Sequence, residues 1–62
     1  MDKLPHNLDE FNKSSLYNEG YRLIPQGNGL YQVLDTEGFD LCGEALSFKL
    51  AVSAIIDDKT DI

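Results

Sequence analysis

The most apolar run of the chain covers residues 45–57, and its few polar residues recur at helical spacing. Lys49, Ser53 and Asp57 stand four residues apart, so on a helix they would form one narrow polar stripe. No Gly or Pro interrupts the run, which is rich in good helix formers. We therefore predict a C-terminal helix. It begins either at Ala45 or only at Ser47, which would then be its N-cap. Its polar stripe should face water, and the opposite face should be buried: Phe48, Ala51, Val52 and Ile55.

The apolar arc of this helix is wider than a surface helix needs. Leu50 and Ala54 flank the predicted core face on one side, and Ile56 flanks it on the other. Either an N-terminal helix covers these residues through Leu8 and Phe11, or a partner covers them. Leu50, Ala54 and Ile56 are therefore candidate residues of a partner interface.

Residues 8–17 have the pattern of an N-terminal helix. Asn7 suits the N-cap, and Glu10 stands three residues later, where a capping-box partner belongs. Gly20 follows as a stop signal. The helix should depend on packing, because it contains three poor helix formers: Asn12, Ser14 and Ser15.

Three short β-like runs lie between the two predicted helices. The first ends near Pro25, the second covers residues 30–34 and the third covers residues 39–42. Turn-forming residues at 26–29 and 35–38 separate them, which is typical of an antiparallel meander. The predicted fold is α+β: an N-terminal helix, a three-stranded antiparallel β-meander and a C-terminal helix packed on the sheet (α-β-β-β-α).

The length of 62 residues predicts one small domain, 1–62, with flexible ends at residues 1–6 and 58–62. A core of this size is marginal, and oligomerisation is a common reinforcement. A disulfide within the chain is excluded because Cys42 is the only cysteine. One Cys and one His cannot form a usual zinc site, so we expect no metal and no cofactor.

The formal net charge is −6, from eleven acidic and five scattered basic residues. Direct binding of nucleic acid or of an anionic membrane needs a basic footprint, so neither is expected. The apolar run is too short to span a bilayer, which needs about 20 residues. A single cysteine and an N-terminus without a signal-peptide apolar core predict a cytoplasmic protein.

The sequence offers little catalytic chemistry. Cys42 could be a nucleophile, but the only His is His6 near the N-terminus, so a small core thiol is the better interpretation. The glycines at 27 and 29 lack the Lys-Ser/Thr of a phosphate loop and fit a hairpin turn. We expect no enzyme and assign no catalytic residues.

Acidic residues gather in two stretches of sequence. One contains Asp35, Glu37, Asp40 and Glu44, and the other contains Asp57, Asp58 and Asp61. Such residues usually form a solvated face. The functional alternative is a docking surface for a basic partner, with the first four as candidate interface residues.

These observations predict a small non-enzymatic module for protein–protein interaction or regulation. Its partner would be a second copy, giving a homodimer, or a larger protein that is possibly basic. The alternative is an acidic mimic of nucleic acid that inhibits a DNA- or RNA-processing protein. The helix–meander–helix layout is of a type met among small bacterial and phage proteins, although no motif makes it specific.

Overall fold

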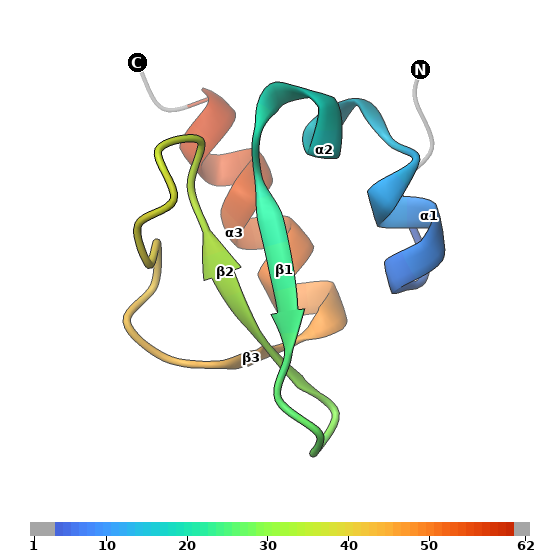
Figure 1. The fold of residues 1–62 in the computed structure, drawn as a ribbon, viewed down its shortest axis with the longest axis vertical. Coiled ribbons are helices and arrows are strands. Elements are labelled where there is room, and N and C mark those ends of the chain that lie inside the picture. The colour runs from blue at the N-terminus through green and yellow to red at the C-terminus, as the bar shows by residue number, and fades with distance from the viewer. Residues whose placement is uncertain (1–3, 61–62) are drawn as a thin grey trace.

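The computed structural model of the protein describes residues 4–60. Its elements follow in the order α1 (Leu8–Asn12), α2 (Ser15–Glu19), β1 (Arg22–Pro25), β2 (Leu30–Leu34), β3 (Leu46–Ser47) and α3 (Phe48–Thr60). The strands form one antiparallel sheet in the order β1-β2-β3, and α3 lies behind it in Figure 1. The predicted α+β layout, with the C-terminal helix packed on the sheet, is confirmed.

Helix α3 buries the face that its sequence pattern predicted. Ala51, Val52 and Ile55 are buried, while the polar stripe of Lys49, Ser53 and Asp57 is exposed. Phe48 is half-buried, and its ring meets that of Tyr31 edge-on at 5.5 Å. Burial of this apolar face stabilises the two-layer fold.

The helix begins at Phe48, which agrees with the second of the two predicted starts. The Ser47 hydroxyl accepts a long hydrogen bond of 3.5 Å from the Leu50 backbone N–H. A start at Ala45 is wrong, because Leu46 pairs with Tyr31 of β2 instead of entering the helix.

The single helix predicted over residues 8–17 is two short helices in the structure. Ser14 separates them in an extended conformation (φ −90°, ψ 168°), and its hydroxyl donates to the Phe11 carbonyl at 2.6 Å. Serine hydroxyls compete with helical backbone bonding in this way, so the poor helix formers break the helix here. Phe11 and Leu16 are nevertheless both buried in the core.

Both ends of this helical pair follow the sequence signals. The Asn7 side chain caps α1 by accepting from the Glu10 N–H at 2.9 Å. Glu10 accepts in return from the N–H of His6 rather than from that of Asn7. Gly20 ends α2 with φ 119°, a conformation that favours glycine.

Strands β1 and β2 form a hairpin at the predicted turn, where Gly27 and Gly29 have positive φ angles. Leu23 and Val33 pair across the hairpin and are buried under α3. Side chains alternate along a strand, so Ile24 lies on the other face of the sheet, where it is 41% exposed.

The third strand lies later in the chain than the predicted residues 39–42. Of those residues, only Asp40 makes a β-bridge, an isolated one with Leu34. If that register continued, Gly43 would face Tyr31, but Leu46 occupies this position. The chain therefore loops away from β2 after the bridge and returns as β3.

The predicted flexible ends are only partly described. Residues 58–60 belong to α3, whereas residues 1–3 and 61–62 lie outside the described residues. Flexibility of both ends stays a prediction. Between residues 4 and 60, no helix combines the length and apolar character needed to cross a membrane.

Candidate functional site

The loop between β2 and β3 is folded by two of its own aspartates. The Asp35 carboxylate accepts hydrogen bonds from the N–H groups of Glu37 at 2.8 Å and Phe39 at 3.0 Å. The Asp35 N–H donates to the Phe39 carbonyl at 2.8 Å. These contacts close the predicted turn at residues 35–38 and hold the Phe39 backbone from both sides.

Asp40 organises the second half of the loop. One oxygen accepts from the N–H groups of Gly43 at 2.7 Å and Cys42 at 3.1 Å, and the other accepts from the Gln32 amide at 3.1 Å. The Gly43 contact, followed by that of Gln32, lowers the pKa of Asp40. The same contacts explain the displaced third strand, because they turn the backbone away from β2. Asp35 and Asp40 therefore stabilise the loop conformation, in addition to any role in docking.

Phe39 is a feature of this loop that the sequence pattern did not reveal. It was predicted as a strand residue, but 67% of its surface is exposed, the highest fraction among the large apolar residues of the described chain. The signal available in sequence was Asp35 four residues before it, which favours a capped turn over a strand.

A wide, open hollow of about 510 Å³ joins this loop to the last turns of α3. Leu41 and Cys42 line it from the loop, and Ala54, Asp57 and Asp58 line it from the helix. Burial raises the pKa of the Cys42 thiol. The negative charges of two loop carboxylates, Asp40 and Glu44, raise it further. The hollow thus lies between the first acidic stretch and Asp57 and Asp58 of the second.

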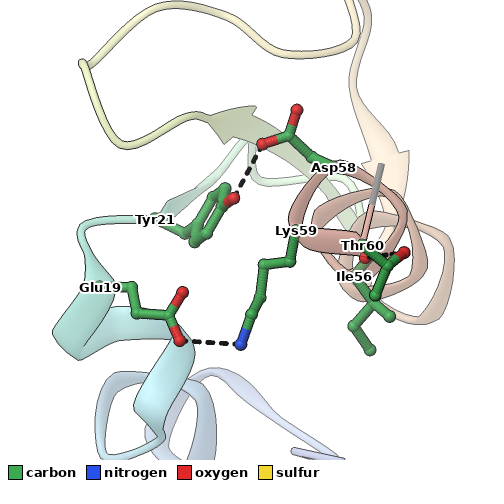
Figure 2. A network of polar contacts seen from close by, with 6 residues as sticks. All are labelled: Glu19, Tyr21, Ile56, Asp58, Lys59 and Thr60. Carbon is green, nitrogen blue, oxygen red and sulfur yellow. Dashed lines mark hydrogen bonds and ion pairs between the residues drawn. The ribbon is translucent and has the colours of Figure 1, made fainter. Parts of the chain in front are cut away.

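Tyr21 links the same region to the start of β1. Its ring is buried, and its hydroxyl donates to the Asp58 carboxylate at 2.8 Å (Figure 2). This hydrogen bond is the main reason that the pKa of Tyr21 rises to about 12, followed by burial and by the charges of Asp58, Glu19 and Asp35. Glu19 also forms an ion pair with Lys59 at 2.8 Å, visible in Figure 2.

We call this region the acidic pole and define it by its carboxylates: Glu19, Asp35, Asp40, Glu44, Asp57 and Asp58. It collects the C-terminal ends of α2, β2 and α3, in the upper part of Figure 1, and the loop that descends from β2 to β3. The negative end of the α3 dipole reinforces its charge. Lys59 contacts the acidic pole through its ion pair with Glu19.

The other predicted interface residues are distributed over several surfaces. Leu50 is 57% exposed on α3 and does not line the hollow, whereas Ala54 does. Ile56 is half-buried on the other flank of α3, in a small cavity that Leu16 of α2 also lines. Glu37 is exposed in the turn that Asp35 caps. The three helix residues therefore do not form one surface.

The structure separates the two residues considered for catalysis. Cys42 lines the hollow of the acidic pole, while exposed His6 lies before α1 with its imidazole 3.4 Å from Glu10. Within residues 4–60, no group of three or more His, Cys, Asp or Glu side chains is arranged to hold a metal ion.

Comparison of the chain with protein families, curated proteins and solved structures finds no match.

Proposed function

We propose that the protein is a small, non-enzymatic interaction module that docks its acidic pole onto a basic surface of a larger protein. One observation supports this most: Asp57 and Asp58 of α3 line a hollow that Leu41 and Cys42 line from the loop, and four further carboxylates lie in the same region. An apolar centre within a charged rim is the usual layout of a protein interface. The charge of the rim would set the sign of the partner's surface and speed the encounter.

A larger basic partner fits the acidic pole better than a second copy of this chain. Two copies that met pole to pole would bring Asp57 and Asp58 of each copy together, and like charges repel. The location proposed for the interaction is the cytoplasm, where the free thiol of Cys42 would remain reduced.

The test is affinity capture with the full chain as bait, from extracts of the cells that produce it. Captured protein should be released as the salt concentration rises to about 1 M, where the Debye length falls to about 3 Å. Release should be independent of salt if apolar contact alone holds the partner.

Two variants of equal charge make the test specific to the pole. Asp57→Asn removes one charge from the wall of the hollow, and Asp9→Asn removes one charge from exposed α1. We expect weaker capture with Asp57→Asn and unchanged capture with Asp9→Asn. An equal effect of both variants would mean that net charge, rather than the acidic pole, drives binding.

The nucleic-acid mimic is a second candidate, supported by the same clustering of carboxylates. If the captured protein binds DNA or RNA, the two proposals predict different competition. A mimic is displaced by a nucleic acid that the partner recognises, whereas a module docked elsewhere on the partner is not. Retention of the complex under saturating nucleic acid would refute mimicry.

Self-association through α3 is supported by the 57% exposure of Leu50. Light scattering at high micromolar concentration should then report a dimer. Leu50→Glu should convert the dimer to monomer, while Leu4→Glu, at a residue that is 56% exposed, should not. A monomeric wild-type chain would refute the homodimer.

A further inference from the structure

The flank of α3 that faces away from the acidic pole carries a second large hollow, of about 430 Å³. Leu4 and Pro5 of the N-terminal segment line it on one side, and Phe48 and Val52 of α3 line it on the other. Its volume lies near the lower end of the range for small-molecule sites, about 300–1,000 Å³. An apolar group of modest size therefore fits between the segment and the helix.

We call this hollow, between the N-terminal segment and α3, the groove. Leu4 and Pro5 also line a separate, smaller cavity of about 180 Å³, where Ile56 contributes from α3. Phe48 and Ile56 are eight residues apart on one helix, so the two hollows follow each other along about 12 Å of α3 at 1.5 Å per residue. An alkyl chain of medium length matches this distance.

The charge at the groove is opposite to that of the whole protein. The net charge is −6, yet among residues 4–60 no carboxylate lines the larger hollow. Its titratable lining residues are the basic ones, Lys49 and His6. Glu10 lies beside His6, so the exposed Lys49 is the cation best placed to meet a ligand.

We propose that this groove binds a small amphiphilic anion, namely a straight-chain carboxylate of medium length. Its alkyl chain lies over Phe48 and Val52, and its carboxylate lies beside Lys49. The chain loses contact with water, which drives binding, and the ammonium group selects an anionic head over a neutral or cationic one. This site is separate from the acidic pole and does not depend on the function proposed for it.

Decanoate, used below its micellar concentration, is the probe for this site. Amide resonances of 15N-labelled protein should shift in a saturable manner at the four α3 residues that line the hollow: Phe48, Lys49, Val52 and Ser53. Decanol and decyltrimethylammonium have the same alkyl chain with a neutral or a cationic head, and both should bind more weakly. Equal binding of all three, or no saturable shift with decanoate, would overturn the proposal.

A charge reversal identifies the group that selects the head. Lys49→Glu should weaken decanoate binding by about fivefold or more and should strengthen binding of decyltrimethylammonium. Lys13→Glu changes the net charge equally at an exposed residue between α1 and α2, and should leave both affinities unchanged. Lys49→Gln provides a second variant that should weaken decanoate binding. The assignment of Lys49 is refuted if Lys49→Glu and Lys13→Glu behave alike.

Discussion

The hydroxyl of Tyr21 offers the sharpest test of how the fold is held together. It donates to Asp58 at 2.8 Å and so connects residues that are 37 positions apart in sequence. Tyr21→Phe removes this hydroxyl and keeps the ring, which is 4% exposed. The change therefore isolates one polar contact between the start of β1 and the last turn of α3.

The strength of this contact bounds the loss of stability. A hydrogen bond to a charged group contributes about 1.5–3 kcal/mol. The rise of the Tyr21 pKa to about 12 also contains burial and repulsion by three carboxylates, so it does not measure this hydrogen bond alone. Asp58 is exposed, so water can replace the lost donor. We therefore expect Tyr21→Phe to lower the free energy of unfolding by about 1–2 kcal/mol.

Urea unfolding at neutral pH, followed by far-UV circular dichroism, measures this loss. The matched control is Tyr31→Phe, because among the described residues no hydrogen bond is formed by the Tyr31 hydroxyl, and its ring packs on Phe48. This control should change stability by less than about 0.5 kcal/mol. The reasoning is refuted if Tyr21→Phe unfolds at the same urea concentration as the wild type.

The pH dependence supplies an independent check. Folding raises the pKa of Tyr21, so the folded state favours the neutral phenol. The contribution of the Tyr21 hydroxyl to stability is then fully present below the pKa that Tyr21 has in the unfolded chain. It is lost as the pH rises through the pKa of Tyr21 in the folded protein. The stability difference between wild type and Tyr21→Phe should stay constant up to about pH 9 and shrink between about pH 10 and pH 12. A difference that persists undiminished would show that the hydroxyl is not its source.

Three further predictions concern the caps and turns. Asn7→Ala removes the acceptor of the Glu10 N–H and should cost about 1 kcal/mol in thermal unfolding, whereas an unchanged midpoint would show that α1 needs no cap. Gly20→Ala should cost about 1–2 kcal/mol in urea unfolding, because a side chain at this positive φ is strained. The new methyl group would also lie 3.4 Å from Thr36, and an unchanged midpoint would contradict the strain. Because its pKa is lowered on folding, ionised Asp40 should stabilise the loop above its ordinary pKa and lose this effect as the pH falls through the folded value. A 13C NMR titration should place that midpoint below 3.8, and a higher value would contradict the hydrogen bonds assigned to Asp40.

Helix α3 could be predicted from sequence because its periodicity is local. The spacing of Lys49, Ser53 and Asp57 identifies the exposed stripe without knowledge of any other element. The hairpin between β1 and β2 was equally accessible, since two glycines with positive φ form its turn. Each signal lies within a few residues of the structure that it specifies.

The third strand could not be placed in this way. Phe39, Leu41 and Cys42 have side chains that suit a strand, but the Asp40 carboxylate binds two N–H groups and turns the chain aside. Leu46 then pairs with Tyr31, a choice that depends on the sheet as well as on local propensity.

The clustering of carboxylates in the acidic pole could not be predicted from sequence either. Its two acidic stretches could be seen in the chain, but how close they lie depends on how α3 packs beside the loop. The hollow that Cys42 lines together with Asp57 and Asp58 is a product of that packing.

The edges of the sheet also affect the tendency of the protein to aggregate. Open strand edges can template the growth of fibrils, and short strands or prolines blunt them. One outer strand, β1, has four residues and ends in Pro25, which has no N–H to donate, and the other, β3, has two residues. A crowded solution of this chain therefore has little free backbone from which an ordered aggregate could grow, despite its exposed apolar side chains.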